Sequence, residues 1–155
     1  MLMGIDIGGT KCAVVVSDAE GRILRKERFA TTNCEETLAN IFAAAERLGA
    51  SEADAIGISC GGPLDEKEGL ILSPPNLPGW DNIPIVSMLK EKFGKPCAIC
   101  NDANAGALAE WKFGAGKGCE NLVFMTFGTG LGAGLILNGA LFSGSCGMAG
   151  EVGHM

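Results

Sequence analysis

Asp6-Ile-Gly-Gly-Thr-Lys11 joins an apolar run at residues 2–7 to a valine-rich run, Cys12-Ala-Val-Val-Val16. Paired glycines between two apolar runs predict a tight turn between two β-strands. A second turn at 18–21 leads into a third run, at 22–29, in which apolar and charged residues alternate loosely. The start of the chain therefore predicts a three-stranded meander, and the two glycines mark its first turn.

Helical and strand patterns alternate after this meander. Asn33 has the position of an N-cap, Glu36 stands at the capping-box position, and apolar residues then recur at helical spacing until Gly49. The later expected elements are a strand at 55–60, a long loop at 61–82, a helix at 84–93, a strand at 96–100 and a helix at 102–113. This order predicts an α/β fold in which helices flank a mixed sheet.

A glycine-rich joint at 114–118 precedes a second set of strands. The expected strands are 122–127, 132–137 and 140–142. Asn138-Gly139 is typical of a hairpin turn, and the whole order of strands and turns repeats the start of the chain. We therefore expect two domains, 1–117 and 118–155, of which the second is the opening of a similar lobe.

The composition argues against several classes of protein. A net charge of −6 without clustered lysine and arginine argues against a sequence-independent nucleic-acid binder. No apolar run approaches the ~18 residues that a membrane span needs. Seven cysteines in a chain that shows no signal peptide favour reduced thiols over a disulfide framework. A cytoplasmic protein with neither a nucleic-acid nor a membrane partner is expected.

The first turn has the residue types of a phosphate-binding loop. Gly8 and Gly9 would let a phosphate group approach the backbone without meeting a side chain. Thr10 offers a hydroxyl group and Lys11 a positive charge. Asp6, at the end of the strand, could hold Mg²⁺ directly or through water. The alternative is a tight hairpin with an incidental aspartate.

A second glycine-rich segment, Gly128-Thr-Gly-Leu-Gly-Ala-Gly134, superficially fits a dinucleotide-binding fingerprint. That fingerprint needs a helix directly after its glycines, whereas a strand and a hairpin are expected here. We interpret Gly128, Thr129 and Gly130 as a second backbone cradle for nucleotide phosphates. A purely structural hairpin is the alternative.

Asn101 and Asp102 lie where a strand passes into a helix. The N-terminus of a helix favours negative charge. Phosphoryl transfer to a hydroxyl group needs a carboxylate that accepts the proton of the attacking group. Asp102 is therefore a candidate general base, and the Asn101 amide could bond sugar hydroxyls. The alternative is that Asp102 only caps the helix.

Gly150-Glu-Val-Gly-His154 is a further polar segment. Glu151 can accept a hydrogen bond from one of two vicinal hydroxyls, and His154 can donate or accept one at the other. His154 could also ligate a metal ion, but no cysteines stand at zinc spacing from it.

Together these segments resemble the ROK family (repressor, open reading frame, kinase), whose glucokinase-like sugar kinases have the actin-like ATPase (ribonuclease H-like) fold. The residues that carry the resemblance are Asp6-Ile-Gly-Gly-Thr-Lys11, Pro75-Asn-Leu-Pro-Gly-Trp80, Asn101-Asp-Ala-Asn-Ala-Gly-Ala107, Phe127-Gly-Thr-Gly-Leu-Gly132 and Gly150-Glu-Val-Gly-His154. The resemblance implies ATP and Mg²⁺ as cofactors, phosphate loops at Gly8–Lys11 and Gly128–Gly130, and Asp102 as the base. The sugar contacts that it implies are Asn76, Asn101, Asp102, Glu151 and His154.

In zinc-containing members of that family, the histidine that matches His154 also binds a structural zinc, with three cysteines shortly downstream. This chain stops at Met155. We therefore expect an N-terminal fragment that is itself inactive, taken from a homo-oligomeric protein.

The resemblance implies ATP-dependent phosphorylation of a hexose or an N-acetylhexosamine. One alternative is a sugar-sensing transcriptional regulator of the same family, although Ile5-Asp6 leaves no room before it for a helix-turn-helix. The other is a sugar-binding module without catalysis.

Overall fold

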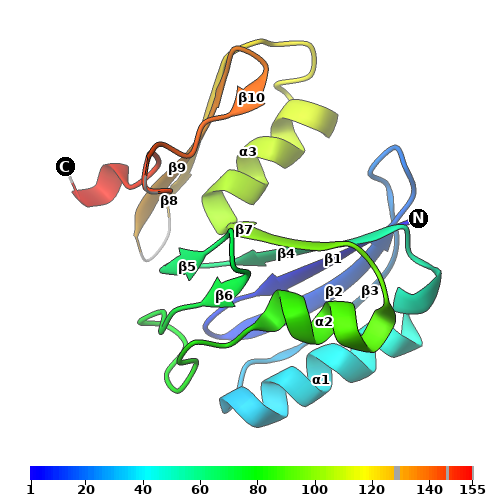
Figure 1. Cartoon of the computed structure of the whole chain (residues 1–155). Helices are drawn as coiled ribbons and strands as arrows, with labels where there is room; N and C mark the ends of the chain where they lie inside the picture. Colours follow the sequence, from blue (N-terminus) through cyan, green and yellow to red (C-terminus); the bar gives the residue numbers. More distant parts are fainter. Residues whose placement is uncertain (128–129, 146, 155) are drawn as a thin grey trace. The chain divides into compact units, whose positions relative to one another are not determined.

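The computed structural model describes residues 1–127, 130–145 and 147–154, and the side chain of His154 lies outside that description. The chain forms two compact units, Met1–Cys100 and Asn101–Met155 (Figure 1). The domain boundary expected between residues 117 and 118 stays a prediction for the longer protein.

The first unit is built on a mixed five-stranded sheet in the order β3-β2-β1-β4-β7. The strands are β1 (Leu2–Ile7), β2 (Lys11–Ser17), β3 (Ile23–Ala30), β4 (Ala55–Cys60) and β7 (Cys97–Asn101). β1 pairs antiparallel with β2 and parallel with β4, and β2 pairs antiparallel with β3. The predicted meander and the predicted mixed sheet are confirmed.

Buried and exposed side chains alternate along β1, and this alternation explains why the strand forms and which side chains it leaves exposed. Met3, Ile5 and Ile7 are each at most 2% exposed, whereas Asp6 between them is exposed. The strand thus contributes one apolar face to the core and leaves a carboxylate near its end, next to the turn.

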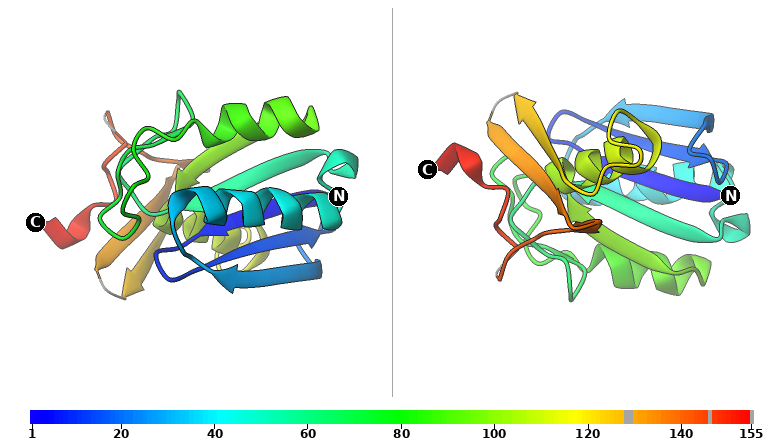
Figure 2. Two further views of the ribbon diagram at one scale, coloured as in Figure 1. Left: turned by 90° about the horizontal axis from the view of Figure 1, so that it is seen from below. Right: turned by 90° about the horizontal axis from the view of Figure 1, so that it is seen from above.

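Two helices, α1 (Cys34–Arg47) and α2 (Ile85–Phe93), lie side by side on one face of this sheet (Figures 1 and 2). Phe42 of α1 stacks on Phe93 of α2, with ring centroids 6.2 Å apart. Their buried residues join those of the strands in one apolar cluster. This cluster is the core beneath the first unit's candidate site residues.

The ends of α1 follow the sequence pattern. Asn33 is the N-cap, and its side chain accepts a hydrogen bond of 2.9 Å from the Glu36 backbone N–H. Gly49 follows the last turn with φ of 87°, a left-handed conformation that glycine adopts readily. A short 3₁₀ helix, η1 (Ala50–Glu52), then leads into β4.

The segment expected as one long loop is more ordered than the sequence suggests. It contains two short antiparallel strands, β5 (Leu64–Asp65) and β6 (Leu70–Ile71). The Gly69 backbone N–H donates to the Asp65 carbonyl at 2.8 Å and closes the turn between them. The expectation of an unbroken loop is therefore wrong at β5 and β6, because two-residue strands are too short to show an alternating pattern.

The second unit has α3 (Asp102–Phe113) packed on β8 (Leu122–Phe127) and β9 (Leu131–Leu137). In its described part, β10 (Ala140–Leu141) completes a three-stranded antiparallel sheet in the order β10-β9-β8, and η2 (Val152–His154) follows. This meander repeats that of β3-β2-β1, as the internal repeat predicted.

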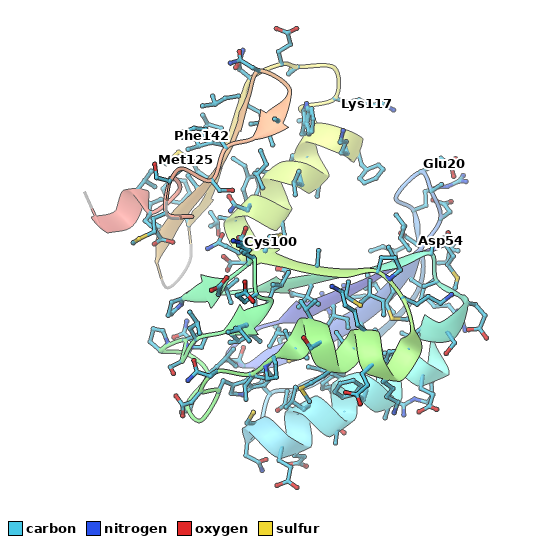
Figure 3. The ribbon with its side chains drawn as sticks, in the orientation of Figure 1. Glu20, Asp54, Cys100, Lys117, Met125 and Phe142 are labelled. Atoms are coloured by element: carbon cyan, nitrogen blue, oxygen red, sulfur yellow. The ribbon has the colours of Figure 1, made fainter. Side chains whose placement is uncertain are left out.

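β8 has one face on α3 and one exposed apolar face. A Cβ atom on Gly106 of α3 would lie 2.5 Å from the Phe124 ring, so this side is closely packed. Val123, Met125 and Phe127 on the opposite side are 58%, 45% and 79% exposed. Figure 3 labels Met125, together with Phe142, which is also exposed and follows β10.

Within the described ranges of the chain, no helix is long and apolar enough to span a bilayer.

Candidate functional site

The candidate phosphate turn links β1 to β2. The Gly8 backbone N–H donates to the Lys11 carbonyl at 3.2 Å, and a Cβ atom at Gly8 would lie 2.8 Å from that oxygen. The narrow turn therefore requires a glycine at this position. Thr10 and Lys11 are both exposed, so a hydroxyl group and an ammonium group are available at the rim of the turn.

Thr31, just beyond β3, holds this turn in place, a role that was not predicted from the sequence. Its hydroxyl donates to the Gly8 carbonyl at 2.6 Å, and its backbone N–H donates to the Thr10 carbonyl at 3.0 Å. The Cys12 sulfur lies 3.3 Å from the Thr31 hydroxyl oxygen. Burial raises the pKa of the Cys12 thiol, so this group stays protonated at neutral pH and serves as a packing residue.

Asn76 lies exposed in the proline-rich loop of the same unit. Gly9 of the turn abuts this residue: a Cβ atom on Gly9 would lie 2.7 Å from both the Cβ and the carbonyl oxygen of Asn76. The first unit thus brings together the candidate phosphate turn and the candidate sugar residue Asn76.

In the second unit, Asn101 is the N-cap of α3, and Asp102 is the first residue of the helix. The Asn101 side-chain oxygen accepts from the backbone N–H groups of Ala103 at 2.8 Å and Asn104 at 3.2 Å. The Asp102 carboxylate is exposed and accepts one bond of 2.8 Å, from the Ala103 N–H. Since Asn101 provides the cap, capping alone does not account for Asp102.

The alternating glycines of β9 have a structural reason. A Cβ atom on Gly134 would lie 2.4 Å from the Ala103 carbonyl oxygen and 2.6 Å from the Ala107 Cβ. Gly134 thus lets the strand pack against the first turns of α3. Gly128 and Thr129 lie outside the described residues, and Gly130 is exposed. The second phosphate cradle therefore stays a prediction.

The polar segment at the end of the chain is attached to the same strand. The Ala133 backbone N–H donates to the Gly150 carbonyl at 2.8 Å. A Cβ atom on Gly153 would lie 2.6 Å from the Leu131 carbonyl oxygen. Within the second unit, β9 thus contacts both the start of α3, which carries Asp102, and the segment that carries Glu151. His154 ends η2, and its side chain lies outside the description.

The described residues offer different prospects for the two metals implied by the resemblance. No group of three or more histidine, cysteine, aspartate or glutamate residues is gathered anywhere in the described part of the chain, so the ligands of a structural zinc are not assembled there. Mg²⁺ needs only one or two carboxylates beside water and phosphate oxygens. The exposed carboxylate of Asp6, next to the candidate phosphate turn, fits that requirement.

The similarity of the chain to known proteins identifies its family. The sequence model of the ROK family matches residues 2–155. The chain belongs to the ROK family. It is 38% identical to a glucokinase of Streptomyces coelicolor, covering 100% of this chain and 49% of that protein. It is also 35% identical to a xylose repressor of Caldicellulosiruptor bescii, covering 99% of this chain and 40% of that protein.

A solved ROK family structure gives the fold. The glucokinase from Streptomyces griseus, in complex with glucose and AMPPNP, matches with a TM-score of 0.87 and 39% identity, covering 99% of this chain and 50% of that chain. The expected actin-like ATPase fold is confirmed by this similarity among ROK proteins. The chain spans about half the length of the curated glucokinases that it matches.

Proposed function

We propose that this ROK protein is an ATP-dependent hexose kinase. The observation that supports the proposal most is the close approach of Gly9, in the turn at 8–11, to Asn76, because we propose the turn as the phosphate site and Asn76 as a sugar contact. The S. griseus relative, which holds glucose and an ATP analogue, supports this interpretation. A hexose or an N-acetylhexosamine is the proposed substrate class.

In this proposal Asp102 accepts the proton of a sugar hydroxyl as the hydroxyl oxygen attacks the γ-phosphorus of ATP. The bond from that phosphorus to the bridging oxygen breaks, and ADP leaves with the electron pair. The turn at Gly8–Lys11 and residues Gly128–Gly130 bind the phosphates, while Asn101, Glu151 and His154 orient the sugar. Mg²⁺, which Asp6 would hold, neutralises phosphate charge when bound.

A cytoplasmic homo-oligomer completes the proposal. Light scattering coupled to size-exclusion chromatography of the full-length gene product measures the oligomeric state. A monomer at all concentrations would remove this part of the proposal and leave the catalytic part unaffected.

The catalytic proposal is tested by ADP release from the full-length protein with ATP, Mg²⁺ and each of glucose, fructose, allose and N-acetylmannosamine. Sugar-dependent ADP release with at least one of them is expected. If none supports turnover above the sugar-free rate, the protein is not a kinase for these sugars, and calorimetry then shows whether it binds sugar without catalysis.

A sugar-responsive repressor is the second candidate, favoured by the similarity to the C. bescii xylose repressor. Retarded migration of promoter DNA by the full-length protein, released by sugar, would support it. A protein that shows sugar-dependent ADP release and no DNA retardation would support the kinase.

Thr31→Val is expected to raise the KM for ATP about 2- to 10-fold. The substitution removes the 2.6 Å hydrogen bond from the Thr31 hydroxyl to the Gly8 carbonyl, which holds the phosphate turn. A hydrogen bond of this kind contributes about 0.5–1.5 kcal/mol. The neighbouring Thr32→Val is the matched control, since the Thr32 hydroxyl faces Thr37 at 3.4 Å instead of the turn. Steady-state kinetics with ATP varied at saturating sugar measures both variants. Equal effects of the two substitutions would refute the assigned role of Thr31.

A further inference from the structure

Two adjacent glycines in the turn lack side chains for different structural reasons. A Cβ atom at Gly8 would meet the Lys11 carbonyl oxygen, which belongs to the turn itself, at 2.8 Å. A Cβ atom at Gly9 would meet Asn76, which is distant in the sequence, at 2.7 Å. Neither glycine has a left-handed φ, so the bulk of an added methyl group is the obstacle at both positions.

The loop that Gly9 meets is firmly anchored. Leu77 is 2% exposed and Trp80 is fully buried, so two of the four residues that follow Asn76 belong to the core. The Leu77 N–H donates to the Pro74 carbonyl at 2.9 Å, and the Ser73 N–H donates to the Trp80 carbonyl at 3.0 Å. The loop cannot move away from Gly9 without disturbing these bonds or this burial.

The Asn76 contact involves the main chain as well as the side chain. One of the two close atoms is the Asn76 carbonyl oxygen, and the other is its Cβ, which fixes where the amide group starts. A shift forced at Gly9 would therefore relocate the whole residue instead of rotating a flexible side chain. Displacing a substrate-orienting group by about 1 Å can cost about 100-fold in rate.

We propose that Gly9 is a positioning residue for the sugar: its missing side chain lets the Asn76 loop seat against the phosphate turn and sets where the Asn76 amide meets a sugar hydroxyl. This inference rests on the proposed function, in which Asn76 contacts the sugar. The two glycines then have different roles. Gly8 shapes the phosphate turn, and Gly9 sets the position of the loop that carries Asn76.

The experiment compares Gly9→Ala with Gly8→Ala in the full-length protein. Isothermal calorimetry measures the Kd for the best sugar and for AMPPNP separately. Gly9→Ala is expected to weaken sugar binding about tenfold or more and AMPPNP binding by a smaller factor, because the displaced Asn76 loop adds a loss at the sugar to any loss at the phosphate turn. Gly8→Ala is expected to show the opposite pattern. Gly57→Ala in β4 is the folding control, since its Cβ atom would meet only the Met3 carbonyl oxygen, at 4.0 Å, among the described residues.

A double-mutant cycle with Asn76→Ala tests the route of the effect. If Gly9 acts through Asn76, Gly9→Ala should weaken sugar binding much less in the Asn76→Ala background than alone. Equal loss in both backgrounds, or a Gly9→Ala effect confined to AMPPNP, would overturn the proposal. Wild-type protein that binds no sugar would instead overturn the proposed function, so the two failures are distinguishable.

Discussion

Asp102→Asn is expected to lower kcat for sugar phosphorylation by about 10²- to 10⁴-fold, the range that a general base contributes. The substitution removes the basic carboxylate and preserves shape. It also preserves the local structure, because the asparagine side-chain oxygen can still accept the 2.8 Å bond from the Ala103 N–H. The N-cap of α3 is unaffected, since Asn101 provides it. Initial rates at saturating ATP and sugar measure the loss.

Glu110→Gln is the matched control, because it makes the same carboxylate-to-amide change on the same helix, near the other end. The Glu110 carboxylate accepts a bond of 2.9 Å from the Ala115 N–H, which glutamine can also accept. Its kcat should stay within about twofold of wild type, as is usual for surface changes. An Asp102→Asn variant that binds sugar and ATP normally and turns over at the wild-type rate would show that Asp102 is not the base.

The parts of the fold that follow from local patterns were predictable. The paired glycines at 8 and 9 gave the first turn, and the capping pattern at Asn33 and Glu36 gave the start of α1. Each of these depends on residues within one turn or one hairpin. Local sequence therefore placed the candidate phosphate turn between β1 and β2 correctly.

The role of Thr31 was out of reach because it depends on strand register. Lys11 of β2 pairs with Ala30 of β3, and this register puts Thr31 beside the turn. A meander can be predicted without its register, and a shift of one residue would turn the Thr31 hydroxyl away from Gly8. The only indication in the sequence is a threonine pair directly after the third strand.

The glycines of β9 show a different difficulty. The alternation that ends at Gly134 invited a phosphate-binding interpretation, yet Gly134 is required by the close approach of Ala103 from α3. A glycine that makes room for a ligand and one that makes room for a helix look the same in a sequence. Only the position of the packing partner separates these roles, and that partner lies about thirty residues away.

Trp80→Ala is expected to lower the free energy of unfolding by about 3–5 kcal/mol, the usual cost of removing a large buried aromatic side chain. Trp80 is fully buried, heads the largest side chains in the core, and anchors the loop that carries Asn76. Urea denaturation followed by circular dichroism measures the change. Sugar affinity should fall together with stability, because the loop that seats Asn76 loses its anchor.

Trp80→Phe separates the contribution of packing from that of hydrogen bonding. The Trp80 Nε1 atom is buried and has no hydrogen-bond partner among the residues that the structure describes. Phenylalanine therefore fills much of the space and gives up no bond, so a cost of about 1–2 kcal/mol is expected. Phe113→Ala, at a side chain that is 53% exposed, should cost about 0.5 kcal/mol or less. If Trp80→Ala costs no more than Phe113→Ala, then Trp80 does not anchor the loop, and the rigid seat inferred for Asn76 fails with it.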